Sequence, residues 1–104
     1  MLELRPNCEW CDADLPPQST NARICSYECT YCVDCVDNVL CDVCPTCGGN
    51  FAPRPIRPKR AYRGKPILGL ANQPAETKRK HSKFTAEEVG AFIANLKGVP
   101  PDHR

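Results

Sequence analysis

The residues best suited to chemistry in this 104-residue chain are nine cysteines, all between Cys8 and Cys47. Eight of them form four pairs whose members are separated by two or three residues. A gap of this length lets both sulfurs of a turn face one metal ion, and two such turns complete a tetrahedron. We therefore expect two closed four-thiolate sites, each holding a structural zinc ion. The pairs are Cys8 and Cys11, Cys25 and Cys29, Cys32 and Cys35, and Cys44 and Cys47.

Disulfides and iron–sulfur clusters would use the same side chains. The odd cysteine count, the close pairing and a first segment without the basic and apolar regions of an export signal favour metal thiolates over disulfides. The spacing of Cys25, Cys29 and Cys32 is that of the cluster loop in radical SAM enzymes, but the chain is too short for their barrel. Cys29, Cys32 and Cys35 also have ferredoxin-like spacing, but the next cysteine follows too late for that motif.

Cys41 is the ninth cysteine and belongs to none of the four pairs. We expect it to be a small apolar residue at or just after a helix. A spare metal ligand and a redox thiol are the alternatives, and a redox or metal-handling protein with labile thiolates is one alternative function for the whole chain. No basic residue stands beside Cys41 in the sequence to lower the pKa of its thiol.

The local sequence around the cysteines resembles a RING finger, in which eight ligands bind two zinc ions in a cross-brace. Cys29-Thr30-Tyr31-Cys32 and Cys44-Pro45-Thr46-Cys47 are similar to two of its motifs. The resemblance implies one ion at Cys8, Cys11, Cys32 and Cys35 and the other at Cys25, Cys29, Cys44 and Cys47. Spacing alone also allows neighbouring pairs to share an ion.

Residues 1–50 as a whole look like the small bacterial RING-like proteins grouped as domain-of-unknown-function family 1272. The run from Met1 to Pro17, the run from Ala22 to Cys35 and the closing Cys44-Pro45-Thr46-Cys47-Gly48-Gly49 carry this resemblance. It implies a bacterial source and a fold, and brings no activity with it. Gly48 stands where active ubiquitin ligases commonly carry a basic residue, so we do not expect ligase activity.

Charge divides the chain into two parts. Residues 1–52 carry two basic and eight acidic residues, a net charge of −6, whereas residues 53–104 carry twelve basic and four acidic residues, a net charge of +8. The proline-rich basic stretch 53–83 predicts an extended, flexible linker. It could bind nucleic-acid phosphates, fold back on the acidic part or remain solvated. The candidate phosphate contacts are Arg54, Arg57, Lys59, Arg60, Arg63, Lys65, Lys78, Arg79 and Lys80.

Three further elements follow from local patterns. Residues 22–27 have the composition of a short strand, and residues 33–40 have the apolar spacing of a two-turn helix. Thr85 and Glu88 form a capping-box motif before an apolar stripe, which predicts an amphipathic helix over 86–97 within a segment 84–104. Such a short helix needs a surface to pack on.

The predicted protein is thus a small metal-stabilised α+β module (1–52), RING-like or treble-clef in type, followed by a basic linker and one amphipathic helix. No catalytic triad, carboxylate pair or phosphate-binding loop is present, so we expect a non-catalytic cytoplasmic interaction module. We expect a protein partner, with nucleic acid as the alternative, and neither a membrane nor a small-molecule substrate. The predicted protein contacts are Trp10, Val36, Val39, Leu40, Phe92, Ile93 and Leu96.

Overall fold

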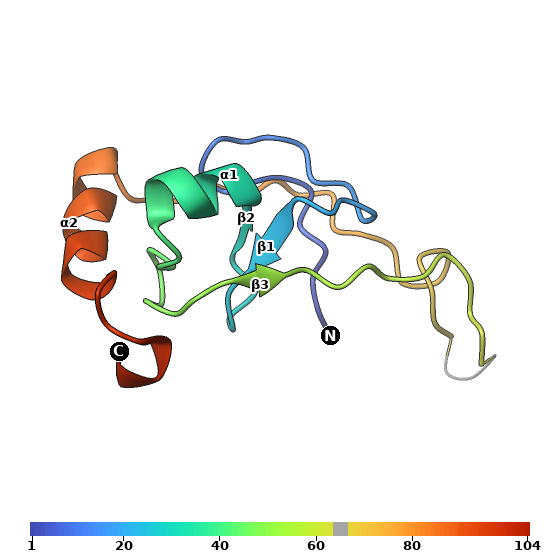
Figure 1. Cartoon of the computed structure of the whole chain (residues 1–104). Coiled ribbons are helices and arrows are strands. Elements are labelled where there is room, and N and C mark those ends of the chain that lie inside the picture. Colours follow the sequence, from blue (N-terminus) through green and yellow to red (C-terminus); the bar gives the residue numbers. More distant parts are fainter. Residues whose placement is uncertain (64–66) are drawn as a thin grey trace.

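The fold is built on a small antiparallel sheet whose strands are only two or three residues long. The computed structural model describes residues 1–63 and 67–104. Strand β1 (Ala22–Ile24) lies between β2 (Thr30–Cys32) and β3 (Ala52–Pro53), so the strand order is β2-β1-β3 (Figure 1). Arg23 is opposite Tyr31 on one side and Pro53 on the other. The predicted strand 22–27 therefore forms, but it ends after Ile24.

A short helical segment follows β2 directly. Helix α1 (Val33–Cys35) continues without a break into the π-helix η1 (Val36–Leu40), so the predicted two-turn helix is present over its full length. Cys41 ends it with a left-handed backbone, φ 49°, and its N–H donates to the carbonyl of Val36. Leu40 is fully buried, and Val43 behind it is buried as well.

Helix α2 (Ala86–Leu96) begins at the predicted capping box. The Glu88 N–H donates to Thr85 Oγ1 at 3.2 Å, and the Thr85 N–H donates to Glu88 Oε1 at 3.0 Å. Val89 and Ile93 are buried against the cysteine-rich part of the chain, and the helix lies beside η1. The partner surface that this amphipathic helix requires is therefore supplied by the same chain. The 3-10 helix η2 (Pro101–His103) follows it.

The core contains little besides sulfur and a few apolar side chains. The rings of Tyr31 and Phe51 meet edge to face, with centroids 5.5 Å apart and planes at 77°. Six cysteines are among the buried residues of the same cluster. A core this small cannot by itself offset the conformational entropy of folding, so the cysteine clusters must contribute much of the stability.

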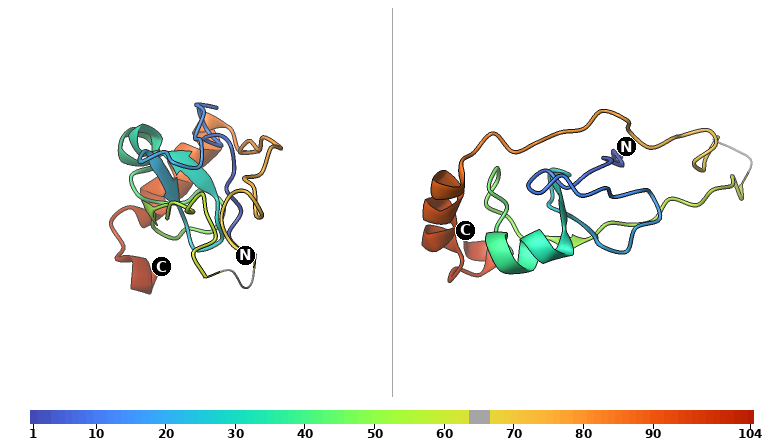
Figure 2. Two further views of the ribbon diagram at one scale, coloured as in Figure 1. Left: turned by 90° about the vertical axis from the view of Figure 1, so that its right-hand side faces the viewer. Right: turned by 90° about the horizontal axis from the view of Figure 1, so that it is seen from above.

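Between β3 and α2 the chain runs outward to residue 63 and returns from residue 67 (Figure 2). The described residues of this stretch form no helix or strand. The returning arm nevertheless lies against the N-terminal part: Glu76 N–H donates to the Leu4 carbonyl at 3.0 Å, and Ser82 N–H donates to the Glu9 carbonyl at 2.7 Å. The returning arm thus folds back on the acidic part, which is one of the three possibilities considered, whereas Lys59, Arg60 and Arg63 of the outgoing part stay exposed.

Candidate metal centre

The first sulfur cluster joins the N-terminal loop to the end of β2 and the start of the helix. The Sγ atoms of Cys8, Cys11, Cys32 and Cys35 all lie within 4.8 Å of one another. The loop that carries the first pair closes on itself, because the Asp12 N–H donates to the Cys8 carbonyl at 2.9 Å. Asp12 adopts a left-handed backbone, φ 66°, to make this turn. Four sulfurs are thus gathered by two short turns that lie 21 residues apart in sequence.

The second cluster lies near the start of β2, because Cys29 directly precedes this strand. The Sγ atoms of Cys25, Cys44 and Cys47 lie within 4.8 Å of one another. Cys29 is not in this group, but it is buried beside it, and its carbonyl accepts from the Cys25 N–H at 3.2 Å. Backbone donors also point at the sulfurs: Tyr27 N–H lies 3.4 Å from Cys25 Sγ, and Gly49 N–H lies 3.4 Å from Cys47 Sγ. N–H groups aimed at sulfur favour the thiolate form, which is the form that binds metal.

Glycine is required in the turn that carries the last pair. Gly48 has φ +80° and its N–H donates to the Cys44 carbonyl at 2.8 Å, which bends the chain so that the sulfurs of Cys44 and Cys47 face each other. A Cβ at Gly48 would also lie 3.1 Å from the Cδ1 atom of Leu96 on α2. Gly48 therefore shapes the turn that carries Cys44 and Cys47, and its lack of a side chain leaves room for helix α2.

The sulfurs group by alternate pairs along the chain. The first cluster takes the first and third pairs, and the second cluster takes sulfurs of the second and fourth pairs. Neighbouring pairs, which the spacing also allowed, are not brought together. The two clusters consequently interlock, because the chain passes from the first cluster to the second, back to the first and then to the second again.

Electrostatics show why sulfurs so close together fit a cation. The neighbouring thiols of Cys29 and Cys44 lower the pKa of Cys25 to about 3, whereas the thiols of Cys25 and Cys29 raise the pKa of Cys44. Burial, reinforced by Cys32, likewise raises the pKa of Cys35. Two like charges 4 Å apart repel by about 4 kcal/mol at an effective dielectric of 20, so neighbouring thiolates cannot all ionise unaided. A divalent ion at the centre removes that obstacle, and the donor set of each cluster fits one.

Cys41 is exposed and lies in neither cluster. The expectation that it is an ordinary residue at the end of the helix agrees with this position. Its left-handed backbone belongs to the turn that ends η1. The spare-ligand alternative is not supported by the placement of its sulfur.

Two of the predicted protein-contact residues near the helix are corrected by the structure. Val36 and Leu40 are buried in the core and cannot contact a partner, because η1 turns this face inward. Val39, which directly precedes Leu40, is exposed. Trp10 is partly buried and packs against the core cluster from the first metal loop.

The contact residues predicted on α2 divide in the same way. Ile93 is buried and Leu96 is partly buried against the core cluster, so neither offers a free surface. Phe92 stays exposed at the edge of the helix. The prediction missed this division because the apolar stripe alone does not say whether its partner is the same chain or another.

The basic residues proposed for nucleic acid are used in several ways. Arg54 is 4% exposed, and Arg57 is half-buried and donates to the carbonyls of Leu2 and Gln73. Arg54 is therefore a correction, since a buried guanidinium cannot meet a phosphate. Arg79 and Lys80 pair with acidic residues of the N-terminal part. Lys59, Arg60, Arg63 and Lys78 are exposed, and Lys65 lies outside the described residues.

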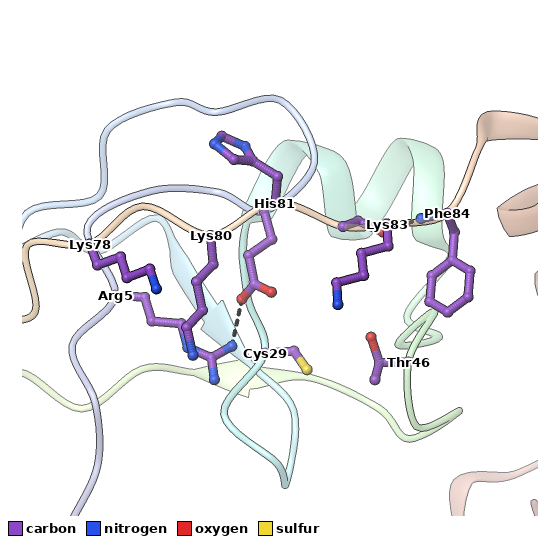
Figure 3. A pocket seen from close by; sticks show the side chains of 10 residues that line it. Arg5, Cys29, Thr46, Lys78, Lys80, His81, Lys83 and Phe84 are labelled. Atoms are coloured by element: carbon purple, nitrogen blue, oxygen red, sulfur yellow. Dashed lines mark hydrogen bonds and ion pairs between the residues drawn. The ribbon is translucent and has the colours of Figure 1, made fainter.

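A shallow cavity of about 590 Å³ lies where the returning arm passes the second cluster (Figure 3). Cys29 lines it, together with lysines of the arm. The guanidinium of Arg5 donates to the Glu9 carboxylate at 2.8 Å, and that carboxylate also accepts from the Thr30 N–H. Arg5 and Glu9 are only four residues apart, whereas the contact between Glu9 and Thr30 joins residues 21 apart and forms only through the tertiary fold.

The part of the chain that the structure describes contains no helix long and apolar enough to cross a membrane.

The fold and the sulfur clusters define a small cysteine-rich α+β module with two groups of thiols able to hold metal ions. The family described as "Protein of unknown function (DUF1272)" matches residues 1–57, more than half of the chain, and the protein belongs to this family. It is similar to an uncharacterized protein of Rhizobium meliloti (strain 1021), with 57% identity over 58 residues, covering 56% of this chain and 69% of the relative. No solved structure matches the chain.

Proposed function

We propose that this protein is a non-catalytic interaction module whose N-terminal half is organised by two structural zinc ions in a RING-like cross-brace. The observation that carries the proposal is the alternation of the two sulfur clusters along the chain. In a cross-brace each ion ties together two turns that are far apart in sequence. Each ion therefore closes long chain segments that the small core could not hold alone.

The donor set favours zinc and a structural role. Four thiolates at one point form a soft, tetrahedral site, which suits zinc and has no open position for water or substrate. Seven of the eight sulfurs belong to buried or half-buried residues, so access from solvent is poor. When bound, zinc would supply cross-linking and charge neutralisation. The chain's own residues supply the turns and the N–H groups that hold the sulfurs in place.

The contact surface of such a module consists of residues that the fold leaves outside. Val39 and Phe92 are exposed apolar side chains on η1 and α2, and Trp10 is half-buried on the first metal loop. Because the apolar side chains beside them are in the core, this surface is smaller than the sequence suggested. A protein partner is the occupant that we propose.

A second candidate function rests on the loop that runs outward from β3 to residue 63 (Figure 2). Lys59, Arg60 and Arg63 are exposed there, next to the exposed ring of Tyr62. Cations beside an exposed aromatic ring favour single-stranded nucleic acid. Binding with a steep salt dependence that is lost in an Arg60→Ala, Arg63→Ala double variant would support this function. Unchanged binding in that variant would contradict it.

The metal proposal is tested by native mass spectrometry and by cobalt substitution. We expect two zinc ions per chain, and cobalt in their place should give the sulfur-to-metal charge-transfer bands and the intense visible bands of tetrahedral thiolate sites. One zinc per chain, or bound iron, would contradict the two-zinc cross-brace. Chelation should unfold residues 1–57, and an unchanged circular dichroism spectrum in chelator would contradict a structural role.

A further inference from the structure

The returning arm of the chain lies along the N-terminal loop. Residues 76–82 run in extended conformation beside residues 4–14, with backbone hydrogen bonds from Glu76 to Leu4 and from Ser82 to Glu9 (Figures 1 and 2). We call the surface of the N-terminal loop that the arm contacts the acidic edge. Its residues are Glu3, Leu4, Asn7, Glu9, Asp12 and Asp14.

The side chain of Asn7 hydrogen-bonds with the backbone of the arm. Its Nδ2 atom donates to the Lys80 carbonyl at 2.8 Å, and its Oδ1 atom accepts from the Lys80 N–H at 3.2 Å. A carboxamide that pairs with both backbone groups of one residue imitates a neighbouring strand and needs no particular side chain there. This pairing selects an extended segment.

The metal loop fixes Asn7 for this task. Asn7 is 0% exposed, and its Nδ2 atom also contacts the Cys8 carbonyl at 3.1 Å and Asp12 Oδ1 at 3.0 Å. Both contacts come from the loop that carries the first pair of cysteines. The carboxamide is therefore held in its pairing orientation by the same turn that presents two sulfurs to the first cluster.

The acidic edge also selects charge. The Arg79 guanidinium pairs with Asp12 and with Asp14, each at 2.9 Å, and donates to the Asp12 carbonyl at 2.7 Å. Lys80 Nζ lies 3.6 Å from Glu3. These contacts demand a basic residue at the position of Arg79 and favour a second one at the next position.

The acidic edge and the arm that covers it differ in whether they lie within the residues that match the family. All the residues of the acidic edge lie within residues 1–57, the part that matches the family, whereas the arm lies beyond it. The Arg79 side chain is 38% exposed and that of Asp14 is 82% exposed, so these ion pairs are screened by solvent and exchange readily. The acidic edge thus belongs to the part of the chain that matches the family, and the arm is one example of a segment that can bind it.

We propose that the acidic edge is a recognition site for extended basic peptide segments of partner proteins, and that residues 76–82 are its intramolecular occupant. The peptide adds along the Leu4 to Glu9 backbone, as in strand-addition complexes, and its arginine enters between Asp12 and Asp14. This inference rests on the proposed interaction module and names the chemistry of its partner. The arm competes with the peptide at a high effective concentration, so binding in trans requires that the arm be displaced.

The test uses the full-length, zinc-loaded chain and a fluorescein-labelled peptide with the sequence of residues 74–84. In the Arg79→Ala chain the arm loses its side-chain pairs while the peptide keeps its arginine. Fluorescence anisotropy should show this variant binding the peptide about tenfold more tightly than the unmodified chain does. A peptide with glutamate in place of that arginine should not bind.

A matched pair of variants locates the site. Adding Asp14→Lys to the Arg79→Ala chain should weaken peptide binding about tenfold, whereas adding Asp37→Lys, the same charge change on an exposed residue of η1, should change it much less. Equal effects of the two changes would mean nonspecific charge attraction and would overturn the proposal.

Two further outcomes separate this inference from the proposed function. An Arg79→Ala chain that carries two zinc ions and has the native circular dichroism spectrum, but does not bind the peptide, would overturn the inference and leave the zinc scaffold intact. If sedimentation analysis showed a dimer that does not bind the peptide, the acidic edge would be occupied by the arm of a second copy. This result would also overturn the inference. Failure of the unmodified chain to bind zinc would instead refute the proposed function.

Discussion

The buried guanidinium of Arg54 gives the sharpest test of how the basic stretch is attached. Its Nη1 atom donates to the Arg5 carbonyl at 2.8 Å, and its Nη2 atom donates to the carbonyls of Leu15 and Pro16, each at 3.1 Å. Burial lowers the pKa of Arg54, and in the described residues no carboxylate pairs with it. The informative substitution is Arg54→Met, which keeps an unbranched apolar stem and removes every donor.

The expected loss of stability follows from these three bonds. A hydrogen bond contributes about 0.5–1.5 kcal/mol net, and somewhat more when the donor is charged, while a buried carbonyl left without a donor costs about 1–3 kcal/mol. Removal of the desolvated charge offsets part of this loss. We therefore expect Arg54→Met to lower the free energy of unfolding by about 2–4 kcal/mol. For a domain of this size the melting temperature should fall on the order of 15 °C.

The measurement is thermal and urea unfolding of the zinc-loaded chain, followed by circular dichroism at a fixed free zinc concentration, because bound metal shifts the apparent stability. Arg60→Met is the matched control, since Arg60 is exposed and the same substitution should change stability by less than about 0.5 kcal/mol. If Arg54→Met cost no more than this control, the three carbonyl contacts would not fasten the chain and the reasoning would be wrong.

Three further predictions concern the metal centre and α2. In native mass spectrometry Cys8→Ser should bind one zinc ion in place of two, and its stability should fall by several kcal/mol. Cys41→Ser, a change at an exposed cysteine, should keep both ions, and loss of an ion from this variant would contradict the assignment. Gly48→Ala should destabilise the fold by about 1–2 kcal/mol because of its positive φ and its contact with α2, while Gly98→Ala, where a Cβ meets open space, should be nearly neutral by thermal melting. Thr85→Ala removes a capping hydrogen bond and should cost about 1 kcal/mol, seen as faster amide hydrogen exchange in the first turn of α2; unchanged exchange would contradict this.

The local elements were the predictable part of the fold. The capping box at Thr85 and Glu88 fixed the start of α2, and the predicted end, Lys97, is the residue that caps it. The helix over 33–40 was also anticipated, although the π-helical winding of its second half was not. These features depend on hydrogen bonds and side-chain spacing within a few residues, which the sequence displays directly.

The acidic edge could not have been predicted in the same way. Asn7 and Glu9 carry no motif, and their partners at Lys80 and Ser82 lie more than 70 residues further along the chain. The charge asymmetry did raise the possibility that the basic half folds back on the acidic half. Charge alone, however, does not say that Arg79 pairs with Asp12 and Asp14 rather than with the other carboxylates of the N-terminal part.

The sequence by itself determined the chemistry of this protein, because closely paired cysteines present sulfurs to a metal ion through turns of only a few residues. The tertiary structure decided which pairs cooperate, since that depends on how β2 and the helix after it carry the third pair back to the first. It also decided which apolar and basic side chains face solvent. Val36, Ile93 and Arg54 are buried for this reason, although the local sequence does not say which surface covers them.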